Sequence, residues 1–173
     1  NECFLPPGED ASCPYFWPIG NRYIFLFFSH TTGSQYLLGD YNKEEHCFYP
    51  TFHGRFNFMS FLPGGVHAPS ATSDGKGGVI VIHNMHTGKK SPGWRGITTL
   101  PRKLTLDKCD TINIQPYGDY KSLRTHHQHI DKTHLPANKE IIIDNIQGNA
   151  LEIKAEINIK SSPMIEMNVL RSP

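Results

Sequence analysis

A chain of 173 residues with a formal net charge of +1 can hold one domain and part of a second. Its Lys and Arg residues form no stripe or cluster, so the charge pattern gives no indication of a nucleic acid or of an anionic membrane surface as partner. The longest apolar run, residues 24–28, is far shorter than the ~20 residues that a membrane-spanning helix needs.

Strand patterns dominate the first two thirds of the chain. Residues 22–29 are rich in aromatic and branched side chains, as a buried strand requires, and a turn cluster at 31–34 leads into a second apolar run at 35–41. Two such runs around a glycine-containing turn predict an antiparallel hairpin. Further strands are predicted at residues 78–83, 97–100 and 111–116.

The fold class predicted by these elements is all-β. Fifteen Gly and 13 Pro residues interrupt the strands, and no amphipathic helix lies between them, so a sandwich, barrel or propeller is favoured over a doubly wound α/β fold. The pattern changes after about residue 135. From 151 to 159 apolar and polar residues alternate, which predicts a strand with one buried and one solvated face. We therefore divide the chain into residues 1–134 and residues 135–173.

An acidic pair near the start is the first candidate site. Glu9 and Asp10 lie in a loop rich in Gly, Ser and Pro, and the aromatic residues Tyr15, Phe16 and Trp17 follow closely. Carboxyl groups act at glycosidic bonds, and flat apolar rings stack on sugar C–H faces, so this combination suits a carbohydrate site. The alternative is an exposed acidic loop before an aromatic core strand.

Histidines and cysteines supply weaker candidates. His67 follows two glycines in residues 63–70 and could donate a hydrogen bond to a ligand, or could simply be exposed in a loop. A histidine cluster at 126–129, with His134, invites a metal hypothesis, but only Asp131 lies close enough in sequence to add an acidic ligand, so no metal site or cofactor is predicted. The four cysteines lack C-x-x-C spacing and are predicted to be buried free thiols.

In order along the chain, these segments resemble the family 32 glycoside hydrolases, the invertase, inulinase and levanase group. Residues 12–20, Ser-Cys-Pro-Tyr-Phe-Trp-Pro-Ile-Gly, with the apolar strand after them, are similar to the Glu-Cys-Pro-Asp motif of that family's third blade. Residues 65–70, Gly-Val-His-Ala-Pro-Ser, are similar to its Phe-Tyr-Ala-Pro segment. Residues 93–106 resemble the Gly-Trp…Leu-Pro-Arg-Glu-Leu stretch of its last blade, and residues 112–124 its exit from the propeller.

The resemblance implies a partial five-bladed β-propeller, from its third to fifth blades, over residues 1–134, and the beginning of a β-sandwich over residues 135–173. It also implies retaining cleavage of fructosyl bonds in sucrose or fructans, by an Asp nucleophile, a Glu acid/base and an Asp that binds sugar hydroxyls. The family's Asn-Asp-Pro-Asn-Gly and Arg-Asp-Pro motifs, which carry the two Asp residues, do not occur in this sequence. The resemblance therefore predicts a chain that needs the missing N-terminal blades, or a second copy, to act.

Ser12 stands where the family has the Glu before Cys-Pro. The resemblance therefore makes Glu9 the first candidate for the acid/base, with Asp10 as the second and Glu2 as the third. Tyr15, Trp17 and His67 are the predicted substrate-binding residues. The competing hypothesis is a non-catalytic carbohydrate-binding or interaction module of the same fold.

Overall fold

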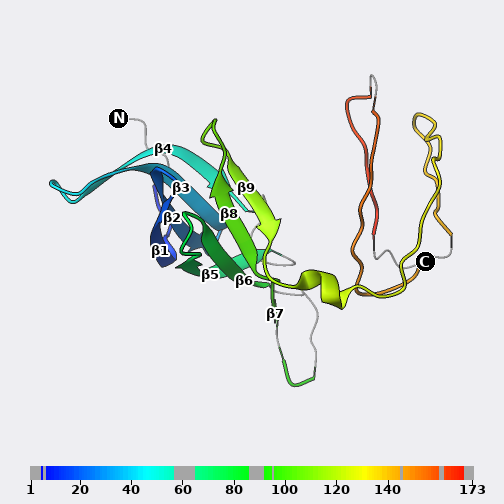
Figure 1. Ribbon diagram of the computed structural model, residues 1–173, viewed down its shortest axis with the longest axis horizontal. Helices are drawn as coiled ribbons and strands as arrows, with labels where there is room; N and C mark the ends of the chain where they lie inside the picture. Colours follow the sequence, from blue (N-terminus) through cyan, green and yellow to red (C-terminus); the bar gives the residue numbers. More distant parts are fainter. Residues whose placement is uncertain are drawn as a thin grey trace. The chain divides into compact units, whose positions relative to one another are not determined.

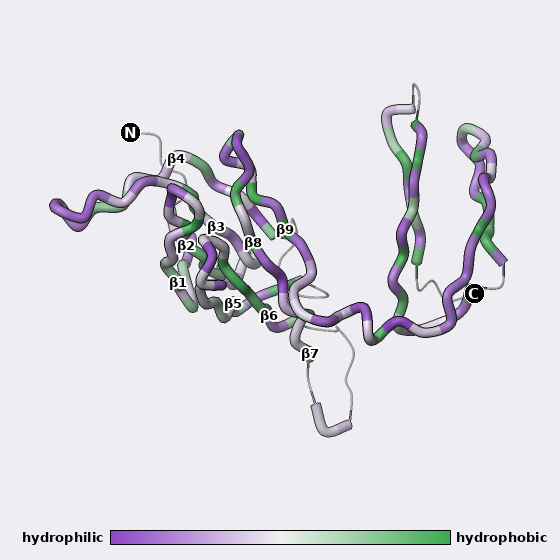
Figure 2. Tube along the Cα trace, in the orientation of Figure 1, coloured by the Kyte–Doolittle hydropathy of each residue, from purple (hydrophilic) through white to green (hydrophobic). Residues whose placement is uncertain are grey.

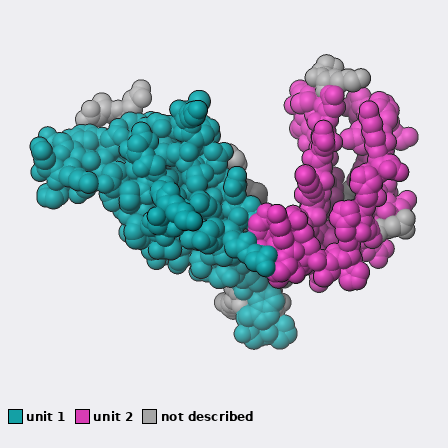
Figure 3. All heavy atoms as spheres, viewed as in Figure 1, with its two compact units in different colours: residues 1–119 teal, residues 120–173 magenta. Residues whose placement is uncertain are grey.

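The computed structural model describes residues 5, 7–56, 65–85, 92–94, 96–144, 146–159 and 162–169 (Figure 1). The chain divides into two compact units, residues 1–119 and residues 120–173, which Figure 3 shows in different colours. The domain boundary predicted after residue 134 lies inside the second unit.

The first sheet of unit 1 is a four-stranded antiparallel meander. It contains β1 (Ser12–Ile19), β2 (Arg22–Ser29), β3 (Gly33–Asn42) and β4 (Cys47–Arg55), in that order. The predicted hairpin is confirmed, because β2 and β3 pair from Tyr23 opposite Gly39 to Ser29 opposite Gly33. A β-bulge interrupts the β1–β2 ladder between Ser12 and Tyr15 and redirects the chain that enters β1.

The second sheet of unit 1 has the strand order β5-β6-β8-β9. Its strands are β5 (Val66–Ser73), β6 (Val79–Met85), β8 (Arg102–Leu106) and β9 (Ile112–Pro116), and the short β7 (Ile97–Thr98) pairs with β6 beyond the end of β8. The resemblance predicts the third to fifth blades of a propeller, and the described residues of unit 1 form two antiparallel sheets. The segment that resembles a further blade contains β7 and β8, and these strands pair with β6 instead of starting a third sheet.

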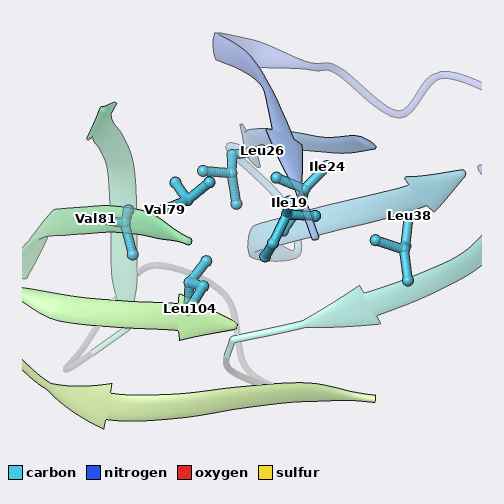
Figure 4. Close-up of a cluster of buried hydrophobic side chains, with 7 residues drawn as sticks. All are labelled: Ile19, Ile24, Leu26, Leu38, Val79, Val81 and Leu104. Atoms are coloured by element: carbon cyan, nitrogen blue, oxygen red, sulfur yellow. The ribbon is translucent and has the colours of Figure 1, made fainter. Parts of the chain in front are cut away.

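The hydrophobic core of unit 1 lies between its two sheets. Branched aliphatic side chains from both sheets point toward one another there (Figure 4). All are at most 1% exposed, and each such burial contributes roughly 1.5–3 kcal/mol. The cluster consists of Ile19, Ile24, Leu26, Leu38, Val79, Val81 and Leu104.

Unit 2 contains no sheet among its described residues. A single turn of 3-10 helix (Tyr120–Leu123) is followed by extended chain that runs out and back twice (Figure 1). The alternation of apolar and polar residues is visible along this chain (Figure 2). The predicted half-buried strand at 151–159 is wrong: these residues make no ladder, and Leu151 and Ile157 are 45% and 44% exposed. Alternation creates an apolar face, but the side chains on that face, Leu151, Ile153, Ile157 and Ile159, stay 44–51% exposed.

The prediction of buried cysteines is also wrong for the residues that can be described. Cys13, Cys47 and Cys109 are free thiols, as predicted, but all three are exposed. Cys3 lies outside the described residues. No helix in the described parts of the chain is long and apolar enough to cross a membrane.

Candidate functional site

The acidic pair lies at the edge of the first sheet where β1 begins and β2 ends. Glu9 and Asp10 precede β1, and the bulge after Ser12 directs them toward the β2–β3 turn, residues 30–32. This turn follows the buried end of β2 and carries only polar side chains. The sheet therefore places two carboxylates against a row of hydrogen-bond donors.

Asp10 is held by three donors. Its Oδ1 accepts a hydrogen bond from the His30 amide at 2.9 Å, and its Oδ2 contacts His30 Nδ1 at 2.7 Å and accepts one from the Ser12 hydroxyl at 2.8 Å. The His30 side chain first, and then the Ser12 hydroxyl, hold the pKa of Asp10 well below its ordinary value. Asp10 is therefore a fixed anion, which suits it to accept hydrogen bonds and not to give up a proton.

Glu9 meets two threonine hydroxyls. Thr31 Oγ1 donates to Oε1 at 3.2 Å, and Thr32 Oγ1 donates to Oε2 at 3.0 Å. Partial burial raises the pKa of Glu9, but hydrogen bonds from Ser29, Thr32 and Thr31 outweigh this effect and lower the pKa below its ordinary value. Within this chain Glu9 is ionised at neutral pH.

A second layer of polar side chains lies behind the threonines. The Gln35 side-chain amide donates to Thr32 Oγ1 at 2.5 Å, and Gln35 Oε1 lies 2.6 Å from His53 Nε2. Gln35 belongs to β3 and is fully buried, while His53 belongs to β4 and stacks on Phe27 with ring centroids 6.5 Å apart. Sequence reasoning missed this layer because the residues are up to 44 positions from Glu9, and only the sheet brings them together.

His67 lies near the acidic pair through an aromatic contact. The ring of Phe28 stands 5.4 Å from the ring of His67 and 4.8 Å from the ring of His30, which binds Asp10. Glu9, Asp10 and His67 are therefore gathered around the same end of β2. His30, Thr31 and Thr32 were missed as site residues, although a polar run directly after a buried strand is the signal that could have identified them.

Tyr15 and Trp17 point to the other side of their strand from Phe16. Both pack, partly buried, against the core cluster between the sheets. Trp17 Nε1 is buried and has no hydrogen-bond partner in the described structure. Phe16 is 38% exposed and contacts Tyr23 and Tyr41, with ring centroids 5.2 and 5.4 Å apart. A sugar contact by Tyr15 and Trp17 stays a prediction, as does that by His67.

The remaining candidate residues are Glu2, the start of the His67 loop and the histidine cluster of unit 2. Glu2, the third candidate acid/base, and residues 63–64 of the His67 loop lie outside the described residues. In the histidine cluster of unit 2, His129 Nε2 lies 3.6 Å from Asp131, and both side chains are exposed. Among the residues that the structure describes, no three His, Cys, Asp or Glu side chains are grouped so that they could hold a metal ion.

Two antiparallel sheets that pack through a common aliphatic core define unit 1 as an all-β protein with blade-like sheets, which confirms the predicted fold class. A solved structure of glycoside hydrolase family 32 from Bifidobacterium adolescentis is similar to this chain, with a TM-score of 0.50 and 15% sequence identity. The similarity covers 65% of this chain and 19% of that chain. It supports a distant resemblance at the level of the fold. No protein-family model and no curated protein sequence matches the chain.

Proposed function

We propose that this chain is the later part of a retaining glycoside hydrolase that cleaves fructosyl bonds in sucrose or fructans, with Glu9 as its acid/base. The observation that carries the proposal is the pair of neighbouring carboxylates, held by a row of donors at one edge of a blade-like sheet. The likeness of the fold to that of a family 32 glycoside hydrolase supports a hydrolase-like fold for this chain. The chemistry requires one carboxyl that exchanges a proton and one that attacks.

The two carboxylates suit different roles. Asp10 is held as an anion by His30 and Ser12, whereas the donors to Glu9 are neutral hydroxyls. In a retaining enzyme the nucleophile carboxylate stands ~5–5.5 Å from the acid/base. A second negative charge at that distance raises the pKa of Glu9 and so opposes the hydroxyls that lower it. Glu9 thus becomes a proton donor only when the nucleophile is in place.

The nucleophile would come from outside this chain, on N-terminal blades or on a second copy. The aromatic face of the first sheet is a suitable contact for such a partner, because Phe16 is 38% exposed there beside Tyr23 and Tyr41. A neighbouring blade would cover these rings and remove apolar surface from water. The carbohydrate would then lie between Glu9 and the added blades, within reach of His67.

A non-catalytic carbohydrate-binding module is the second candidate. The lowered pKa values of both Glu9 and Asp10 favour it, because permanently ionised carboxylates accept hydrogen bonds from sugar hydroxyls without any proton transfer. Such a module would bind fructosides and release no product.

Product analysis separates the two candidates. The full-length protein that carries this chain is incubated with sucrose, inulin and levan, and released fructose is followed by NMR, which also reports its anomeric form. The proposal predicts fructose released first as the β-anomer, with retention. Saturable binding without cleavage would support the module instead, and inversion would contradict the retaining mechanism.

A further inference from the structure

The hydrogen bonds behind Glu9 form a chain through three side chains. From His53 Nε2 the chain passes to Gln35 Oε1 at 2.6 Å, from the Gln35 amide nitrogen to Thr32 Oγ1 at 2.5 Å, and from Thr32 Oγ1 to Glu9 Oε2 at 3.0 Å. We propose that His53, Gln35 and Thr32 are positioning residues for Glu9, a one-way relay that leaves Oε1 as the oxygen that carries the catalytic proton. The role assigned to Oε1 rests on the proposed function.

Donor chemistry fixes the direction of the relay. An ionised Glu9 can only accept hydrogen bonds, so the Thr32 hydroxyl must donate its single hydrogen to Oε2. The Thr32 oxygen then accepts from the Gln35 amide group, which turns the Gln35 carbonyl oxygen toward His53. Because a carbonyl oxygen cannot donate, His53 must carry its proton on Nε2. Each member therefore has one assigned orientation.

The sheet holds this chain in place. Gln35 is 0% exposed and has no room to exchange its partners with water. The His53 ring lies at 21° to the ring of Phe27, so stacking sets its plane. Gln35 and His53 stand on adjacent paired strands, because β3 and β4 are joined by backbone hydrogen bonds. A hydrogen-bond network anchored on a buried side chain fixes rotamers more firmly than separate surface contacts do.

The two oxygens of Glu9 consequently differ. Oε2 accepts from Thr32 at the end of the relay, whereas Oε1 accepts from Thr31, at 3.2 Å, and Ser29 adds a hydrogen bond to the carboxylate from outside the relay. When Glu9 takes up a proton, protonation at Oε2 would take away the acceptor of the Thr32 hydroxyl, whose oxygen is already held by the Gln35 amide. Protonation at Oε1 leaves the relay intact and displaces the Thr31 hydroxyl, which can rotate toward Ser29 Oγ at 2.9 Å. In the proposed reaction Oε1 is therefore the atom that gives its proton to the leaving group.

A double-mutant cycle tests the relay through the titration of Glu9 itself. The pKa of Glu9 is measured by ¹³C NMR of its carboxyl carbon in the full-length protein, with Glu9→Gln identifying the resonance. Thr32→Val removes the hydroxyl at nearly constant shape, and His53→Phe removes the donor but keeps a ring against Phe27. Both should raise the pKa of Glu9, because each withdraws support from the carboxylate, and Thr32→Ser should restore it. ¹⁵N NMR of His53 should show the proton on Nε2.

Coupling between the sites distinguishes a relay from a general structural effect. The shift caused by His53→Phe should be largely lost in the Thr32→Val background and should persist in the Thr31→Val background, because Thr31 is not part of the chain. An equal shift in both backgrounds, or a neutral His53 with its proton on Nδ1, would overturn the relay. Fructose release by the same proteins tests the proposed function separately: an active enzyme without coupling contradicts only the relay, and coupling without hydrolysis contradicts only the enzyme assignment.

Discussion

Truncation of Leu104 tests whether the two sheets of unit 1 share one core. Leu104 lies on β8, is fully buried, and belongs to the aliphatic cluster that joins both sheets. Leu104→Ala removes roughly three methylene equivalents at about 0.8 kcal/mol each, or roughly 2.4 kcal/mol of transfer free energy. A residual cavity adds to this, so we expect a loss of about 3 kcal/mol, within the ~2–5 kcal/mol range of such truncations.

The measurement is equilibrium unfolding in urea. The midpoint concentration is converted to a free energy of unfolding, with the same dependence of that free energy on urea concentration for all variants. Leu123→Ala is the matched control, because the same substitution at a side chain that is 67% exposed should cost less than ~0.5 kcal/mol. Equal losses at Leu104 and Leu123 would refute the common core. So would a Leu104→Ala protein in which the two sheets unfold in separate transitions.

Three further predictions concern pH and the second unit. Burial lowers the pKa of His83 to about 4. Between pH 6.5 and 4 the unfolded state therefore binds a proton that the folded state does not, and the stability of the fold should decrease as the pH drops through that range. In thermal melts, His83→Phe should make the melting temperature less dependent on pH over the same range. Lys103, with the amides of Lys76 and Gly78, lowers the pKa of Asp74 to about 2. Asp74→Asn should therefore be less stable than the parent protein at pH 7, and this difference in stability should disappear as the pH falls from 3.8 toward 2. Ile157→Ala should cost less than ~0.5 kcal/mol in this chain, because Ile157 is 44% exposed, and a loss above ~2 kcal/mol in urea unfolding would show that its apolar face is covered in solution.

Local pattern predicted the central hairpin and the strands around residues 80 and 114, because these segments are continuously apolar or regularly alternating. It did not predict β4 (Cys47–Arg55), whose side chains are mixed and whose pairing with β3 shifts at Gly39, opposite Pro50. A side chain at Gly39 would collide with the Tyr49 carbonyl oxygen at 2.2 Å. A bulge of this kind depends on the partner strand, so it leaves little trace in the sequence of either strand alone.

The sequence predicts the acidic pair and His67 of the candidate site, but not the residues that hold the acidic pair. Adjacent Glu9 and Asp10 are visible in the sequence, but their donors come from a turn some 20 residues later, and Gln35 and His53 come from further strands. The position of Tyr15 and Trp17 against the core depends on which face of β1 the second sheet covers, and the sequence of β1 does not contain that information. At 151–159 the alternation predicts a half-buried strand, but burial also requires a second surface to cover the apolar face, and Ile157 on that face is 44% exposed.

The role of Glu9 is tested most directly by comparing two leaving groups in the full-length protein. Glu9→Gln keeps shape and hydrogen bonding but cannot give up a proton, so sucrose turnover should fall by ~10²–10⁴-fold. A fructoside with an activated aryl leaving group needs little protonation. Glu9→Gln should therefore lower the turnover of this substrate much less than it lowers the turnover of sucrose. Asp10→Asn should affect both substrates less and to a similar degree. The account would be contradicted if Asp10→Asn abolished turnover of sucrose while Glu9→Gln left it intact, or if neither substitution changed the rate.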